Sequence, residues 1–173
     1  MNVIQLLRDQ VKSAHDTLEA TMGDVTQDVA HFTETGKALP VGAAYAHVIM
    51  SEDMIVSHVL AHKPAEYEND DTGLSEPMPA FGASEWTKHE QWARTVKIDL
   101  PKLKAFSQKV FAATDAYIAS LSEEDLEKEI DVQGMGKNTI VFFITNAIIL
   151  HCASLTGEIS AAKGIQNLKG YPF

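Results

Sequence analysis

The 173-residue chain has one cysteine, Cys152, and only 14 basic side chains against 24 acidic ones. A single cysteine excludes a disulfide within the chain, so the protein suits a reducing compartment. The net charge of −10 argues against a protein that follows nucleic-acid phosphates, because such a protein needs a basic face. Residues 1–8 lack the basic start and the uninterrupted apolar run of a signal peptide.

Long hydrophobic runs are also lacking. The most apolar stretch, residues 140–150, carries Thr145 and Asn146 and is about half as long as a membrane span. We therefore expect a soluble, cytoplasmic protein with neither a membrane nor a nucleic acid as its partner. The length corresponds to one domain, residues 1–173, with enough chain to bury a sizeable core.

Apolar residues recur at helical spacing in four long segments. The first is bounded by Asn2, which can cap the helix, and by Gly23, which we expect to end it in a left-handed conformation. The other three run from Pro40 to His62, from Asp99 to Leu121 and from Asn138 to about Lys163. Residues 122–125 read as a capping box that opens one short extra turn.

The fourth segment allows a second interpretation, because the β-branched and aromatic residues 140–144 would also suit a buried strand. Length favours one buried helix, since glycine and proline are absent from residue 138 until Gly157. Residues 64–98 form a long connection in which residues 84–96 are expected to form a short helix or ordered cover, with Ser84 as its cap. Four helices with one long crossover predict an all-α four-helix bundle.

Cys152 stands beside His151, but neighbours on a helix point about 100° apart, which is poor geometry for a Cys–His nucleophile. We therefore expect a small buried hydrophobic side chain at Cys152. His58 and His62 have the spacing of two metal ligands on one helix face. Their place at the end of the second helix favours the simpler role of complementing the helix dipole.

The remaining histidines differ in their surroundings. His15, His31 and His89 have no visible partners, and we expect them at solvated or edge positions. His47 lies on a core helix, and His151 interrupts an otherwise apolar helical row. A histidine in such a row is most often a satisfied core residue, but two of them on separate core helices could also bind a metal at the bundle centre.

The C-terminal part of the chain resembles a known family. Residues 151–159, His-Cys-Ala-Ser-Leu-Thr-Gly-Glu-Ile, followed by residues 168–173, resemble the C-terminal signature of the DinB-like superfamily. That superfamily consists of four-helix bundles with a long crossover between helices 2 and 3. It includes metal-dependent thiol S-transferases that use mycothiol or bacillithiol. Its ligand in the second helix is matched by His47, and Trp86 and residues 121–126 also resemble family features.

One departure from the family pattern affects the metal site that the resemblance implies. The pattern is His-x-x-x-His-x-Gly-Gln/Glu-Ile, and its second histidine is Leu155 here, which leaves His47 and His151 as metal ligands. Two neutral imidazoles hold a divalent ion weakly. Glu158 lies two turns beyond His151, about 10 Å along the axis, and suits a hydrogen bond better than a shared ion. Either a third ligand comes from elsewhere or the site is degenerate, so we expect zinc or nickel to be weakly held or absent.

The resemblance implies a metal-dependent enzyme, a thiol S-transferase or hydrolase that acts on a small molecule or a low-molecular-weight thiol. The alternative is a metal-free bundle, dimeric, that binds a small ligand or has a structural role. Leu155 favours the alternative, whereas His47 and His151 favour the enzyme. A row of small residues, Ala153, Gly157, Ala161 and Gly164, predicts a close helix contact within the bundle or across a homodimer.

Overall fold

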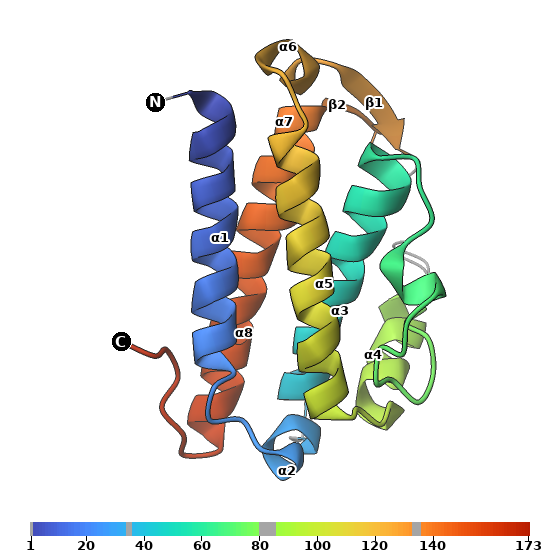
Figure 1. Ribbon diagram of the computed structural model, residues 1–173. Helices are drawn as coiled ribbons and strands as arrows, with labels where there is room; N and C mark the ends of the chain where they lie inside the picture. The colour runs from blue at the N-terminus through green and yellow to red at the C-terminus, as the bar shows by residue number, and fades with distance from the viewer. Residues whose placement is uncertain (1, 34–35, 80–85, 133–135) are drawn as a thin grey trace.

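The computed structural model describes residues 2–33, 36–79, 86–132 and 136–173. Helices take up 66% of the described residues and strands 6%, which confirms the expected all-α class. Four long helices lie side by side along one axis (Figure 1). They are α1 (Val3–Thr21), α3 (Val41–Asp53) continued by η1 (Met54–Leu60), α5 (Leu100–Ala119), and a fourth made of α7 (Ile140–Phe142), η4 (Phe143–Leu150) and α8 (His151–Ile165).

The direction of the helices explains the long connection in the middle of the chain. α1 and α8 run one way along the bundle, and α3 and α5 run the other way (Figure 1). Because α3 and α5 are parallel, the chain has to return along the length of the bundle between them. The return segment contains η2 (Glu66–Glu68) and α4 (Trp86–Thr95), which confirms a helix in this region. The predicted cap of that helix, Ser84, lies outside the described residues.

The ends of the helices follow local side-chain chemistry, with one exception. Asn2 Oδ1 accepts a hydrogen bond of 2.7 Å from the backbone N–H of Gln5, as expected of a cap. The prediction that Gly23 ends α1 in a left-handed conformation is wrong, because its φ is not positive. Met22 instead closes the helix in a right-handed conformation, with its N–H bonded to the carbonyl of Leu18 and its side chain fully buried. The buried side chain stabilises this end, so no left-handed residue is needed.

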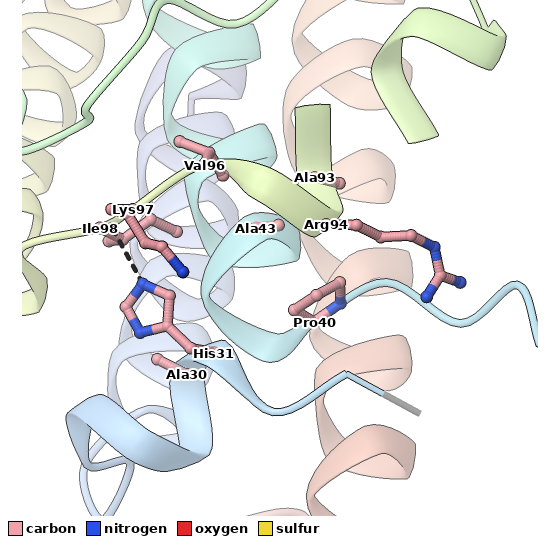
Figure 2. Close-up of a pocket in the computed structure, with 9 residues that line it drawn as sticks. All are labelled: Ala30, His31, Pro40, Ala43, Ala93, Arg94, Val96, Lys97 and Ile98. Atoms are coloured by element: carbon pink, nitrogen blue, oxygen red, sulfur yellow. Dashed lines mark hydrogen bonds between the residues drawn. The ribbon is translucent and has the colours of Figure 1, made fainter. Parts of the chain in front are cut away.

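A short helix, α2 (Gln27–His31), follows α1 in the chain and packs against α3. His31 Nδ1 donates to the carbonyl of Gln27 at 2.8 Å, and its Nε2 accepts from the N–H of Ile98 at 2.9 Å. Figure 2 shows this ring turned toward the backbone just before α5, beside a cavity of about 20 Å³. His31 is half-exposed, which agrees with the expected edge position, and the backbone supplies the partners that the sequence did not show.

The fourth helix begins later than the sequence indicates. After α6 (Glu123–Leu126), strands β1 (Glu129–Val132) and β2 (Gly136–Thr139) form an antiparallel hairpin that pairs Ile130 with Asn138. Asn138 thus belongs to a strand, and Thr139 caps the helix by accepting from the N–H of Phe142 at 3.3 Å. Residues 140–144 are helical, which confirms the helix over the alternative strand.

The described core divides into two hydrophobic clusters along the bundle axis. Between them His15 Nε2 lies 2.9 Å from Glu52 Oε2, and Thr114 Oγ1 donates to Glu52 Oε1 at 2.6 Å. The expectation that His15 is solvated is wrong: its ring is buried and stacks on Phe111 at a centroid distance of 3.7 Å. The sequence did not reveal this because the partners come from α3 and α5, 37 and about 100 residues away in the chain.

The row of small residues on α8 faces outward. Ala153 and Ala161 are exposed, and a Cβ atom added to Gly157 would meet only the hydroxyl of Tyr171, at 3.2 Å. A Cβ atom added to Gly164 would meet nothing within 4 Å. The prediction of a close helix contact within the bundle is therefore wrong, because the C-terminal tail lies over this face instead of a helix. The homodimer stays a prediction.

One helix among the described residues, Ile140–Ile165, is long and apolar enough to cross a membrane by length and composition. The apolar residues 140–150 are therefore part of a longer helix and not an isolated half-span. This is weak evidence for a membrane span, because the core helix of a soluble protein meets the same criterion. The described structure places the helix against α1 and α3.

Candidate metal and ligand site

His47 and His151, the two residues singled out as metal ligands, lie together between α3 and the fourth helix. Their Nε2 atoms are 3.2 Å apart, and their ring centroids are 5.1 Å apart. Two nitrogens bound to one tetrahedral zinc ion, each at the usual bond length, would be about 3.3 Å apart. The same separation also allows one imidazole to donate a hydrogen bond to the other. The pair can therefore either share a cation or form a neutral hydrogen bond.

His89, from α4, joins this pair, so the expectation of a solvated position for it is wrong. Its side chain is buried, and its Nε2 atom lies 2.7 Å from His47 Nδ1. The ring lies near the indoles of Trp86, with which it stacks, and Trp92, at centroid distances of 5.6 and 5.4 Å. Its Nδ1 atom is buried without a hydrogen-bond partner among the described residues. The spacing Trp86, His89, Trp92 marks one helix face and was the available signal that this histidine points inward.

The histidine pair opens into a cavity of about 380 Å³, within the usual size range of small-molecule sites. Two π-helical segments line it: η1 contributes Met54 and Ile55, and η4 contributes Asn146 and Ala147. π-helical turns occur frequently at functional sites. No Lys, Arg, Asp or Glu side chain is among the described lining residues, which are His47, Ser51, Met54, Ile55, Phe142, Asn146, Ala147 and His151.

All three histidines of the site favour their neutral form. Burial is the main cause that lowers the pKa of His47 to about 3, with smaller contributions from charge repulsion by His151 and His89. Burial also lowers the pKa of His89 and of His151, although the charge of Glu52 acts in the opposite direction on His151. Near pH 7 each ring is therefore neutral, with one N–H and one lone pair available for a hydrogen bond or a metal.

Neighbouring residues of the C-terminal motif have other roles. Leu155, at the position of the family's second histidine, is buried in one of the two hydrophobic clusters. Burial raises the pKa of the Cys152 thiol to about 12, which agrees with a buried, unreactive cysteine. The side chain of Glu158 is exposed.

His58 belongs to a separate part of the molecule. Its Nε2 atom lies 2.6 Å from Glu68 Oε1, so its partner is a carboxylate of the long connection between α3 and α5. The hydrogen bond lowers the pKa of Glu68, after the larger effect of the N–H of Ala65. This histidine therefore ties the connection to the end of the second long helix.

The histidine pair supplies two of the four ligands that a tetrahedral zinc ion takes. Within residues 2–33, 36–79, 86–132 and 136–173, no group of three or more His, Cys, Asp or Glu side chains could hold one. His89 approaches the far nitrogen of His47 and not the Nε2 pair, so it is not a third ligand in this arrangement. The two facing Nε2 atoms fit two positions of a coordination shell. The three rings form a row, His151–His47–His89, and the buried Nδ1 atom of His89 lies at the outer end of that row.

Comparisons with known proteins bear on the fold alone. No family model matches the chain, and no curated protein matches it. The crystal structure of a conserved protein from Enterococcus faecalis is similar, with a TM-score of 0.75 and 20% sequence identity. The similarity covers 95% of this chain and 99% of that one, so the arrangement of helices is shared over nearly the whole length.

Proposed function

We propose that this protein is a DinB-like four-helix bundle in which His47 and His151 hold one divalent ion, zinc or nickel, with low affinity. The separation of 3.2 Å between their Nε2 atoms is the observation that carries the proposal. It is supported by the neutral state of both rings, because a protonated imidazole has no lone pair for a metal. Low affinity follows from two protein ligands where catalytic zinc sites usually have three.

The proposed reaction is the transfer of a low-molecular-weight thiol to a small electrophile. A bound divalent ion would supply a Lewis acid that lowers the pKa of a thiol. The protein's own residues bind and orient: His47 and His151 hold the ion at the cavity wall, and Met54, Ile55 and Phe142 shield the reacting groups from water. The absence of charged side chains among the described lining residues favours an uncharged, largely apolar electrophile.

Metal analysis of protein purified without a histidine tag tests this proposal. We expect at most partial occupancy after mild dialysis, and reversible binding of one zinc ion per chain in a calorimetric titration. His47→Ala and His151→Ala should each abolish the binding, whereas His58→Ala, at a histidine paired with Glu68, should leave it unchanged. A tightly held ion that survives dialysis would contradict weak two-ligand binding. Loss of binding only in the His58 variant would show that the metal binds at His58 and not at His47 and His151.

A metal-free bundle that binds a small apolar ligand is the second candidate. It is favoured by Leu155, whose buried side chain occupies the position of the family's second histidine. A fluorescent apolar probe should then bind with the same affinity in the presence of a chelator and of zinc. Phe142→Asp, at the cavity rim, should weaken that binding. A probe that binds only with zinc present would favour the metal-dependent protein instead.

A further inference from the structure

We propose that His89 is a positioning residue: it accepts the Nδ1–H of His47 and so keeps the His47 Nε2 lone pair directed at the ion. This inference rests on the proposed function and names the residue that makes His47 competent as a ligand. The observation behind it is the separation of 2.7 Å between His47 Nδ1 and His89 Nε2.

A neutral imidazole carries one N–H and one lone pair. When His47 Nε2 binds a cation, the proton of that ring must be on Nδ1. The described residue placed to accept it is His89, whose Nε2 atom must then be unprotonated. The His89 proton consequently occupies Nδ1, the buried atom that has no partner among the described residues.

The same three rings can also carry their protons in the opposite direction. His89 Nε2–H then donates to His47 Nδ1, and His47 Nε2–H donates to His151 Nε2, 3.2 Å away. In that state His47 has no lone pair on the side of the cavity and cannot bind an ion. The chain of hydrogen bonds therefore has two directions, and only the one in which His89 is the acceptor permits metal binding.

The surroundings of His89 suit a positioning role. Only 5% of its surface is exposed, and its ring stacks on Trp86 with an interplanar angle of 20°. Trp92, one turn further along α4, lies on its other flank with a centroid distance of 5.4 Å. This packing fixes where the Nε2 atom lies, and outer hydrogen bonds of this kind orient metal-binding histidines in general.

Two substitutions separate the hydrogen bond from the packing. His89→Phe keeps an aromatic ring between the two indoles but removes the acceptor. His89→Gln places an amide oxygen near the position of Nε2, so an acceptor is retained. His58→Phe, at a histidine paired with Glu68 and away from the cavity, is the matched control. Thermal unfolding and near-ultraviolet circular dichroism establish that each variant keeps the native fold.

Zinc titrations followed by calorimetry and by nitrogen-15 NMR of the histidine rings form the test. We expect His89→Phe to weaken zinc binding by about 10–100-fold, the range usual for loss of an outer partner. His89→Gln should recover most of the affinity, and the control should not differ from wild type. The NMR spectrum of the zinc-loaded wild type should show the His47 proton on Nδ1 and the His89 proton also on Nδ1.

Each result leads to a different conclusion. If folded His89→Phe binds zinc as tightly as wild type, the positioning role of His89 is wrong although the metal site stands. Zinc bound through His47 Nδ1 would overturn it as well, because that nitrogen would then have no proton to donate. If wild-type protein binds no zinc, the proposed function is overturned, and this inference with it.

Discussion

His15 and Glu52 form a buried pair in the middle of the bundle, with 2.9 Å between Nε2 and Oε2 and less than a tenth of either side chain exposed. The second oxygen of Glu52 accepts from Thr114, so one carboxyl group joins α1, α3 and α5. The pair separates the two hydrophobic clusters. Because a buried polar group needs its partners, this trio specifies how the three helices align along the bundle axis.

Replacement of Glu52 by alanine should therefore be costly. Glu52→Ala leaves a buried imidazole and a buried hydroxyl without their shared partner, and we expect the free energy of unfolding to fall by about 3–5 kcal/mol. Urea denaturation measures the loss. Glu158→Ala, which removes an exposed carboxylate, is the matched control and should change stability by less than about 0.5 kcal/mol. Equal effects of the two substitutions would mean that the buried trio contributes nothing specific.

Replacement of Leu155 by histidine should create a stronger metal site. The new ring would lie one helical turn from His151 on the same helix face. Because the position is buried among apolar side chains, Leu155→His should lower the melting temperature without metal, and zinc should restore it. Zinc binding should become tighter than in wild type. If the gain survives the additional change His47→Ala, the three positions do not converge on one ion.

The outward row of small residues on α8 permits a direct test of the predicted homodimer. Ala161→Arg places a long charged side chain on an exposed position of that row. If the row forms the dimer contact, light scattering should show the mass falling from dimer to monomer, with the circular dichroism spectrum unchanged. Ala119→Arg, at the exposed end of α5, should leave the mass as it was. A wild-type protein that is already monomeric at high concentration excludes the dimer.

Lys163 and Asp24 anchor the C-terminal tail and the end of α1. The buried Lys163 Nζ donates to the carbonyl of Thr21 and to Asp24 Oδ1, both at 2.5 Å, and to the carbonyl of Gly170. The hydrogen bond from Lys163 is the main reason that the pKa of Asp24 is lowered from 3.8. A lowered pKa contributes stability that is present above the unfolded value and is lost as pH falls through the folded one.

Acid unfolding should therefore depend on Asp24. We expect the melting temperature of wild type to drop below about pH 4, and Asp24→Asn to show a smaller drop in that range. The effect should be small, because half of the Asp24 side chain is exposed and solvent screens the pair. Asp131→Asn, at an exposed position of the hairpin, should retain the pH dependence of wild type. Identical pH profiles for all three proteins would exclude the contribution of Asp24.

Apolar spacing was sufficient to predict the long helices, because each depends on residues three and four apart that any helix brings to one face. The cap at Asn2 and the helix within the long connection were predictable for the same reason: their hydrogen bonds are local. The pairing of His47 with His151 followed from their place on two core helices. Its consequence for a metal ion is still a prediction.

Contacts between segments far apart in the chain decided the features that the sequence did not predict correctly. His89 and His15 have partners 42 and 37 residues away, so no local pattern could reveal which side chains they bind. Whether the row of small residues on α8 faces inward or outward depended on which helix faces are covered in the assembled bundle. The conformation at the end of α1 depended on the burial of Met22. Packing selects among conformations that the local sequence leaves nearly equal in free energy. The packing of α4 in this way placed His89 beside His47 and His151.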